Sequence, residues 1–358
     1  LDGLIEAHDD ADLEAPEHHA RVVILTSGTT GAPKGAPRSE AGIGAAVSLM
    51  SRLPLKYGWR THIAAPLFHT WGFAHLALAM LLGSTVVLRR TFDPEGCLRA
   101  VAEERCDSLV VIPVMLQRML KLPQETLDRY PLPSLKATAA SGSSLAGDLA
   151  VEWMDNFGDN LYNIYGSTEV AYASIATPGD LREAPGSAGR PPHATIVKIL
   201  DELGQEVPAG ESGRIFVGNS MLFEGYTDGG HKEVVDGLMS SGDVGRYGAD
   251  GRLYVEGRDD EMIVSGGENV FPKEIEDCLQ RHEQVVEVAA IGVEDDQFGK
   301  RLRAFVVVCS PEPSEDDLKG WVKESLARFK VPREVVFLDE LPRNSTGKIL
   351  KRELTEPE

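Results

Sequence analysis

The stretch ILTSGTTGAPKG, Ile24 to Gly35, comes directly after a short apolar run that begins at Val22. A short β-branched run bounded by turn residues is typical of a buried strand in a parallel sheet. The loop is therefore expected to leave a strand end, where open α/β sheets bind their ligands. Its glycines allow positive φ and close backbone approach, and successive N–H groups in such a turn form an anion-binding concavity. The predicted ligand is a polyphosphate, and the candidate residues are Thr26, Ser27, Gly28, Thr29, Thr30, Gly31 and Lys34.

The residue pattern of this loop differs from that of the common phosphate loop. That loop ends in Gly-Lys-Ser/Thr and opens a helix, whereas Lys34 follows Pro33 and precedes Gly35, with no helix start directly after it. A standard P-loop nucleotide triphosphatase is therefore not predicted. A flexible surface loop without a ligand stays open as an alternative, because clusters of small polar residues are common in loops.

Charge and cysteine content narrow the class of protein. The chain has 358 residues, 42% of them hydrophobic and 26% charged, which suits two soluble domains or slightly more. The net charge of −20 argues against a nucleic-acid partner or an anionic membrane surface, since both require clustered Lys and Arg. Cysteines stand at Cys97, Cys106, Cys278 and Cys309, without metal-like spacing, and are expected to be reduced and buried in a cytoplasmic protein.

No membrane-directed segment is predicted. The acidic start LDGLIEAHDDADLE lacks the features of a signal peptide. The longest apolar stretch, Leu76 to Leu82, is far shorter than the ~20 residues that span a bilayer. Because the chain begins with Leu rather than Met, a fragment or a trimmed chain is expected.

Strand and helix patterns alternate from Arg21 to about Tyr165. Strands are expected at 61–65, 85–88, 108–112, 135–139 and 161–165, and helices at 41–52, 71–82, 94–103 and 145–157. Such alternation indicates an α/β fold with a doubly wound, mostly parallel sheet. Short strands with Gly and Asp turns, such as 195–200 and 213–218, predict a small β subdomain at about 190–257. Helices at 272–282 and 315–329 with strands at 285–293 and 302–308 predict a separate α+β C-terminal domain, which divides the chain into 1–259 and 260–358.

Three further stretches combine turn residues with polar or charged side chains. Tyr165-Gly-Ser-Thr-Glu169 follows a predicted strand, so it is expected at the same sheet edge as the first loop. Glu169 is a candidate ligand for a divalent cation, and the ring of Tyr165 is a candidate to stack on a base. Ser241-Gly-Asp243 is expected to place a carboxylate in a turn, where it can accept the hydroxyls of a ribose. PRNSTGK presents Lys348 after a glycine turn. Each stretch alone is also consistent with an ordinary turn, but their combination with the first loop points to a nucleotide site.

At these residues the sequence resembles the adenylate-forming superfamily, which includes acyl-CoA synthetases, aryl-CoA ligases, luciferases and peptide-synthetase adenylation domains. The matching stretches are TSGTTGAPKG (26–35), PLFHTWG (66–72), ASGSSL (140–145), YGSTE (165–169), SGD (241–243), GRDDEMIVSGGENVFPKEIE (257–276) and PRNSTGK (342–348). They cover nearly the whole chain and look most like bacterial fatty-acyl-CoA synthetases. Members of the family usually carry well over a hundred residues before the phosphate loop, so the N-terminal part of the large domain is expected to be missing here.

The resemblance implies ATP, Mg²⁺ and CoA and a reaction in two steps. A carboxylate attacks the α-phosphorus of Mg-ATP to give an acyl-adenylate and pyrophosphate, and the CoA thiol then displaces AMP. The implied catalytic residues are Lys348, which bridges the carboxylate and the α-phosphate, Glu169, which holds the metal, and His69, which gates the acyl pocket. The other residues implied at the nucleotide, the pantetheine tunnel and the hinge are Ser141, Gly142, Ser143, Tyr165, Gly166, Thr168, Asp243, Arg258, Gly266 and Asp260.

Some of these residues have plainer readings when taken without the resemblance. A histidine before a helix, as at His69, is more often structural, and Asp260 alone is typical of a solvated charge in an acidic linker. Lys300, Arg301 and Arg303 are candidates for CoA phosphates, although a short basic run in an acidic chain is usually a solvated face.

The predicted function is that of an ATP-dependent fatty-acid CoA ligase, with a small carboxylic acid and CoA as partners. An aryl or short-chain acid stays open as the substrate. A nucleotide-binding remnant without turnover also stays open, because the expected loss of the N-terminal segment would expose sheet edges and apolar faces. The sequence sets no oligomeric state.

Overall fold

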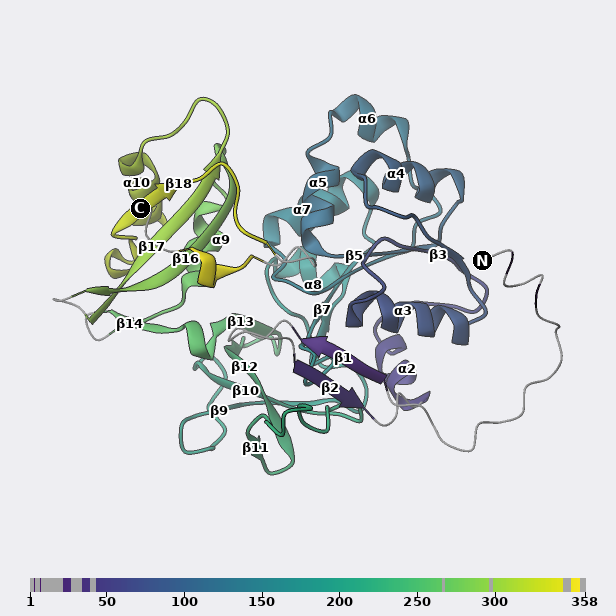
Figure 1. The fold of residues 1–358 in the computed structure, drawn as a ribbon, viewed down its shortest axis with the longest axis horizontal. Coiled ribbons are helices and arrows are strands. Elements are labelled where there is room, and N and C mark those ends of the chain that lie inside the picture. The colour runs from purple at the N-terminus through teal and green to yellow at the C-terminus, as the bar shows by residue number, and fades with distance from the viewer. Residues whose placement is uncertain are drawn as a thin grey trace.

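The computed structural model describes residues 22–26, 34–38, 43–265, 268–295, 299–343 and 349–354, together with the isolated Gly3 and Ala7. Three bodies follow one another along the chain: an α/β layer, a β subdomain and an α+β C-terminal body (Figure 1). Each body has a hydrophobic core of its own.

A six-stranded sheet forms the centre of the first body. Its strand order is β4-β3-β5-β6-β7-β8, in which the first five strands are parallel and the last is antiparallel. The strands are β3 (Arg60–Ile63), β4 (Thr85–Val87), β5 (Ser108–Val111), β6 (Ala137–Ala140), β7 (Leu161–Tyr165) and β8 (Ser174–Ala176). The expected α/β fold with a mostly parallel sheet is confirmed.

Helices cover both faces of this sheet, because successive residues on a strand point to opposite sides. Val110 and Ala139 face the core beneath α2 (Ile43–Met50) and α3 (Thr70–Leu81). Their neighbours Val111 and Ala140 face the opposite core. The helices on that side are α4 (Pro94–Glu103), α5 (Pro113–Leu120), α6 (Gln124–Arg129) and α7 (Gly147–Phe157), and α8 (Pro178–Glu183) follows β8 (Figure 1).

The first loop does not leave a strand of this sheet. Strand β1 (Val22–Thr26) pairs antiparallel with β2 (Lys34–Arg38) in a separate two-stranded sheet, with Thr26 opposite Lys34. The side chain of Val23 is 50% exposed, so the expectation of a buried strand in the parallel sheet is wrong. A β-branched run fits a half-buried hairpin as well as a buried parallel strand, and the run alone does not distinguish them.

The second body is a five-stranded antiparallel sheet with the order β11-β12-β10-β9 and with β13 paired to β12. The strands are β9 (Ile196–Leu200), β10 (Gly213–Gly218), β11 (Val234–Val235), β12 (Leu238–Tyr247) and β13 (Leu253–Arg258). The stretch Ser241-Gly-Asp243 lies inside β12, so its expected place in a turn is wrong. Gly242 has a φ of 81°, which gives one residue of the strand a turn-like conformation that glycine adopts readily.

The C-terminal body has the strand order β15-β14-β17-β16, with β18 parallel to β17. Buried side chains of both its helices, such as Leu279 and Leu318, pack with Val306 of the sheet. The elements are η1 (Asp259–Glu261), β14 (Ile263–Ser265), β15 (Glu268–Val270), α9 (Pro272–Leu279), β16 (Val285–Asp295), β17 (Gly299–Val308), α10 (Glu315–Ser325), η2 (Arg328–Lys330), β18 (Glu334–Phe337) and η3 (Lys351–Glu353).

Two expectations from the sequence concern the cysteines and membrane-spanning segments. All four cysteines are free and three are buried, but Cys309 is exposed, so the expectation of four buried cysteines is wrong for that residue. Cys309 directly follows the end of β17, where the chain leaves the sheet. None of the helices in the described part of the chain combines the length and the apolar character that crossing a bilayer requires.

Candidate functional site

Two predicted motifs follow neighbouring strands of the central sheet. Strand β6 ends at Ala140 and β7 ends at Tyr165, and the two strands are parallel with Ala140 opposite Asn163. The segment 141–143 and Tyr165 therefore lie at the same carboxyl edge, where ligands of open α/β sheets bind.

Glycine shapes the loop that follows Tyr165. A Cβ atom added at Gly166 would lie 2.2 Å from the backbone oxygen of Ala171, so a larger residue does not fit there without moving the backbone. This close approach folds the YGSTE loop back on itself and keeps Glu169 beside the sheet edge, since the Ala173 N–H donates to the backbone oxygen of Tyr165 at 2.8 Å.

Tyr165 is joined to a carboxylate of the β subdomain. Its hydroxyl donates a hydrogen bond of 2.6 Å to Oδ2 of Asp243 and lies 3.1 Å from Oγ of Ser241. Burial raises the pKa of Tyr165 well above its ordinary value, and the charge of Asp243 raises it further. The phenol therefore remains a hydrogen-bond donor, and the contact joins the central sheet to the second body.

One guanidinium links Asp243 to the predicted hinge. Asp243 on β12 is opposite Arg258 on β13, and Nη1 of Arg258 is 3.5 Å from Oδ1 of Asp243. Nε of Arg258 also donates to Oδ1 of Asp260, in η1, at 3.1 Å. Burial raises the pKa of Asp243, whereas the Tyr165 hydroxyl and the charge of Arg258 act to lower it. The predicted ribose carboxylate and the predicted hinge thus share one cation.

Glu169 accepts a hydrogen bond of 2.6 Å at Oε1 from the hydroxyl of Tyr226. Burial acts to raise the pKa of Glu169, but hydrogen bonds from Tyr226 and Ser167 outweigh it, so the pKa lies below its ordinary value. Next to Tyr226, Oγ1 of Thr227 accepts from the Gly35 N–H at 3.2 Å. The expectation that the first loop and the YGSTE loop lie at the same sheet edge is wrong, because β1 and β2 form a separate sheet. In the described part of the chain, Gly35 and Glu169 are instead linked through the neighbouring residues Thr227 and Tyr226.

A family model described as "AMP-binding enzyme" matches residues 4–227, and one described as "AMP-binding enzyme C-terminal domain" matches residues 274–348. The chain belongs to the AMP-binding enzyme family.

Curated members of this family are similar over nearly the whole chain. A feruloyl-CoA synthase from an Amycolatopsis species is 35% identical, over 98% of this chain and 73% of its own length. An indoleacetate–CoA ligase from Aromatoleum aromaticum is 34% identical, over 98% of this chain and 70% of its own length. The match to both confirms the resemblance to the adenylate-forming superfamily and the expected class, an AMP-forming acid–thiol ligase.

Solved structures of the family share the arrangement of elements. The o-succinylbenzoate CoA synthetase of Bacillus subtilis, in complex with an acyl-adenylate intermediate, has a TM-score of 0.84 at 30% identity, over 94% of this chain and 69% of that chain. An amide bond synthetase from Marinactinospora thermotolerans has a TM-score of 0.84 at 29% identity, over 93% of this chain and 68% of that chain.

Several predicted site residues lie outside the described part of the chain. These are Ser27, Gly28, Thr29, Thr30, Gly31, Gly266 and Lys348. The backbone of Thr26 and Lys34 is described, as the pair that closes the β1–β2 hairpin. Their roles stay predictions.

Ordered contacts stand on both sides of Lys348. Arg343 and Ile349 form an isolated antiparallel bridge, and Nη2 of Arg343 is 2.9 Å from Oε1 of Glu287. Three residues after Lys348, Nζ of Lys351 is 2.6 Å from a carboxylate oxygen of Glu261, which follows Asp260 directly. The described residues on either side of 344–348 thus contact the C-terminal sheet and the residue beside the predicted hinge.

His69 caps helix α3. Its Nδ1 accepts a hydrogen bond of 3.4 Å from the Trp71 N–H, and the Trp71 indole N–H donates to the backbone oxygen of Val111 at 2.9 Å. The cap is a structural role of the kind expected for a histidine before a helix. A role as gate of the acyl pocket stays a prediction.

The basic residues of β17 are paired with acidic neighbours. Lys300 is 3.8 Å from Glu294, and Arg303 is 2.7 Å from Glu334. Arg301 pairs with Asp295 at 2.9 Å. Arg303 is buried, so the expectation of a solvated face is wrong for that residue. A role at CoA phosphates stays a prediction.

The sequence motifs did not include Tyr226 and Lys232, two residues that lie near Glu169 and Asp243 on the connection between β10 and β11. The sequence signal is the run Gly225 to Gly230, in which a lone tyrosine follows one glycine and precedes two more. An aromatic hydroxyl in a glycine-rich segment is a candidate ligand or orienting group, but its partner Glu169 is 57 positions away in the chain.

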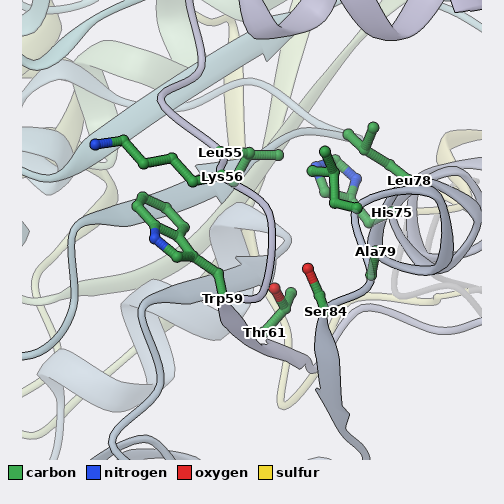
Figure 2. Close-up of a pocket in the computed structure, with 9 residues that line it drawn as sticks. Leu55, Lys56, Trp59, Thr61, His75, Leu78, Ala79 and Ser84 are labelled. Carbon is green, nitrogen blue, oxygen red and sulfur yellow. The ribbon is translucent and has the colours of Figure 1, made fainter.

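A separate cavity lies between the second half of α3, the connection that leads into β3, and β3 itself, and Tyr165, Glu169 and Asp243 do not line it (Figure 2). His75 lines it together with Trp59 and Thr61. Nδ1 of His75 donates to the backbone oxygen of Trp71 at 3.1 Å, and its buried Nε2 has no hydrogen-bond partner among the residues that the structure describes. Burial lowers the pKa of His75 to about 4.

Proposed function

We propose that this chain joins a hydrophobic carboxylic acid to CoA at the expense of ATP. In the first step the carboxylate oxygen bonds to the α-phosphorus, and the bond from that phosphorus to pyrophosphate breaks. In the second step the CoA sulfur bonds to the acyl carbon, AMP leaves, and the thiol proton is released. Pyrophosphate, AMP and the thioester are the products.

The contact between Tyr165 and Asp243 is the observation that carries this proposal. It places a carboxylate with a cationic neighbour, Arg258, at the carboxyl edge of β6 and β7. Carboxylate oxygens suit the two hydroxyls of a ribose, because an ionised acid accepts several hydrogen bonds. The tyrosine ring and the segment 141–143 then flank the base.

Glu169 fits a magnesium ion that arrives with the nucleotide. Hydrogen bonds keep its pKa below the ordinary value, so the carboxylate is ionised, and one of its oxygens is oriented by Tyr226. Mg²⁺ favours hard oxygen ligands and is usually bound by one or two carboxylates together with substrate phosphates. When bound, the ion would offset the negative charge of the phosphates.

Lys348 is the proposed catalytic cation, and Asp260 is the proposed pivot between the two parts of the chain. A lysine between the acid and the α-phosphate lowers the repulsion between two anions that must meet in line. Arg343 and Lys351, on either side of the lysine in the chain, pair with Glu287 and Glu261, which both follow Asp260, so rotation at Asp260 would move the lysine away. Gly266 would then line the path of the thiol.

Two classes of acid are candidates. The motif sequences look most like those of fatty-acyl-CoA synthetases, which favours a fatty acid. Similar proteins are named for ferulate, indoleacetate and 2-succinylbenzoate, which favours an aromatic acid. Fatty acids, ferulate and indoleacetate present an apolar body behind one carboxylate, whereas 2-succinylbenzoate carries two carboxylates. The residues around His69 and Trp71 form the proposed acyl wall.

Pyrophosphate and AMP release tests the proposal. The chain is incubated with Mg-ATP and hexadecanoate, octanoate, ferulate, indoleacetate or 2-succinylbenzoate, with and without CoA. We expect acid-dependent pyrophosphate, AMP release that CoA accelerates, and a clear preference for one class. Lys348→Ala should abolish pyrophosphate release without abolishing ATP binding, whereas Lys300→Ala should change neither. ATP binding without pyrophosphate for any acid would instead identify a nucleotide-binding remnant.

A further inference from the structure

Lys232 lies against the glycine that precedes the ribose carboxylate. A Cβ atom added at Gly242 would lie 3.1 Å from Nζ of Lys232, and 3.1 and 3.2 Å from the two terminal nitrogens of Arg258. The ammonium group and the guanidinium therefore meet on the same side of β12, next to Asp243. Two cations thus lie beside Asp243, and one of them, Arg258, also pairs with Asp260.

The charge of Lys232 reaches both carboxylates of the proposed site. Burial raises the pKa of Asp243, and Lys232 is among the charges that act to lower it. At Glu169, where burial also acts to raise the pKa, the same lysine is the charged neighbour that lowers it. The charge of Lys232 thus acts on both the residue proposed for the ribose and the residue proposed for the metal.

Lys232 differs from Arg258 in its contacts. Arg258 has ion-pair distances to two carboxylates, Asp243 and Asp260. The ammonium group of Lys232 has no hydrogen-bond or ion-pair partner in the part of the chain that the structure describes, although it is only half exposed. The three N–H donors of this ammonium group are therefore available to a ligand.

The backbone around Lys232 is held in place. Phe223, on the same connection, donates its N–H to the backbone oxygen of Glu169 at 2.8 Å, and its ring centroid is 5.2 Å from that of His231. Nδ1 of His231 is 2.7 Å from the backbone oxygen of Lys232. Tyr226 closes a turn with Gly230, through a backbone hydrogen bond of 2.8 Å. The lysine is therefore presented by a segment that is already attached to the YGSTE loop.

From these contacts we infer that Lys232 binds the α-phosphoryl group of the nucleotide. The inference rests on the proposed function, in which Asp243 holds the ribose and Glu169 holds the metal. The α-phosphate is the group that joins the ribose to the β-phosphate, so it must span the space between those two residues. Lysine binds phosphate as a compact point charge. Because Lys232 belongs to the large domain, its contact would persist in AMP and in the acyl-adenylate, unlike one from the C-terminal Lys348.

A comparison of AMP with adenosine tests this role, because the two differ only in the phosphate. Calorimetric titration of the purified chain with each ligand gives the two dissociation constants, and a thermal melt confirms that each variant is folded. For Lys232→Gln we expect the dissociation constant of AMP to rise about tenfold or more, and that of adenosine to stay within about twofold, since hydrogen bonds to charged groups are worth more than neutral ones. Lys232→Arg should restore most of the AMP affinity.

Lys198→Gln is the matched control. It removes one positive charge from the same β subdomain, at a half-exposed residue paired with Glu206 at 3.0 Å, and should leave both dissociation constants unchanged. If Lys232→Gln weakens adenosine and AMP equally, or weakens neither, Lys232 does not contact the phosphate and the inference is wrong. If the wild-type chain binds neither ligand, the nucleotide site itself is wrong, and that result concerns the proposed function first.

Discussion

The hydroxyl of Tyr226 lies 2.6 Å from Oε1 of Glu169, although the two residues are 57 positions apart in the chain. The bond orients the carboxyl group, which also receives a hydrogen bond from Ser167. Partners of this kind orient metal ligands, and their loss typically lowers metal affinity by about 10–100-fold. Tyr226 is thus a positioning residue for the proposed magnesium site.

Tyr226→Phe should weaken divalent-metal binding about tenfold, because only the orienting hydroxyl is removed. The measurement is electron paramagnetic resonance of Mn²⁺ bound to the chain with a non-hydrolysable ATP analogue. Tyr247→Phe is the control, since it removes a hydroxyl that donates to the backbone oxygen of Val197 at 3.2 Å, within the same subdomain. Equal Mn²⁺ binding by both variants would assign Tyr226 a purely structural role.

Arg258→Lys should lower the affinity for AMP about tenfold, because a lysine cannot reproduce the fork that reaches Asp243 and Asp260 together. Calorimetric titration with AMP measures the change. Arg246→Lys is a conservative control in the same strand pair, where Arg246 binds Glu256 at 3.0 Å, and should have little effect. An unchanged dissociation constant for Arg258→Lys would show that the bridge between ribose carboxylate and hinge does not support nucleotide binding.

A buried carboxylate joins the first two bodies. Asp180 is 3% exposed and binds Arg52 at 2.7 Å, Arg190 at 2.7 Å and Arg252 at 2.9 Å, and it also caps its own helix through Thr177. Burial acts to raise the pKa of Asp180, but these hydrogen bonds and charges lower it overall. Three arginines from separate segments therefore share one anion, and Arg252 also pairs with Glu183 and Asp250.

Asp180→Asn should destabilise the chain by about 3–5 kcal/mol, because it leaves the arginine cluster without its shared anion. Urea denaturation, followed by tryptophan fluorescence, measures the change. Asp155→Asn breaks an exposed pair with Arg182 and should cost less than about 1 kcal/mol. Comparable losses for the two variants would mean that the Asp180 cluster is not a centre of stability.

His75 should make stability depend on acid pH. Its pKa is about 4 in the folded chain, below the ordinary 6.5, because burial disfavours the charged ring. Between these two values the unfolded chain binds more protons than the folded chain, so stability is fully present above about pH 6.5 and is lost as the pH falls toward 4. The total effect is of the order of 3 kcal/mol.

Urea midpoints measured between pH 4 and pH 7 check this dependence. His75→Gln should be less stable at pH 7 and should show a flatter acid limb, because the titrating ring is gone. His193→Gln, which replaces an exposed histidine, should keep the wild-type slope. Identical slopes for all three chains would show that His75 does not titrate as its burial indicates.

The sequence by itself determined the fold class and the positions of the motifs, because both follow from local residue patterns. β7 and β10 occupy the predicted residues 161–165 and 213–218, since apolar runs bounded by turn residues report a strand directly. The YGSTE and SGD residues were recognised from their types and spacing alone. Local pattern failed for β1, because a hairpin strand and a parallel strand share the same β-branched composition.

Only the tertiary structure decided which side chains act on one another. The partner of Glu169 is Tyr226, the partner of Asp243 is Tyr165, and Arg258 divides its charge between Asp243 and Asp260. Such pairings depend on how three bodies pack, and periodicity along the chain carries no record of contacts between residues far apart in it. The sequence therefore determined which chemical groups are available, and packing decided which of them meet.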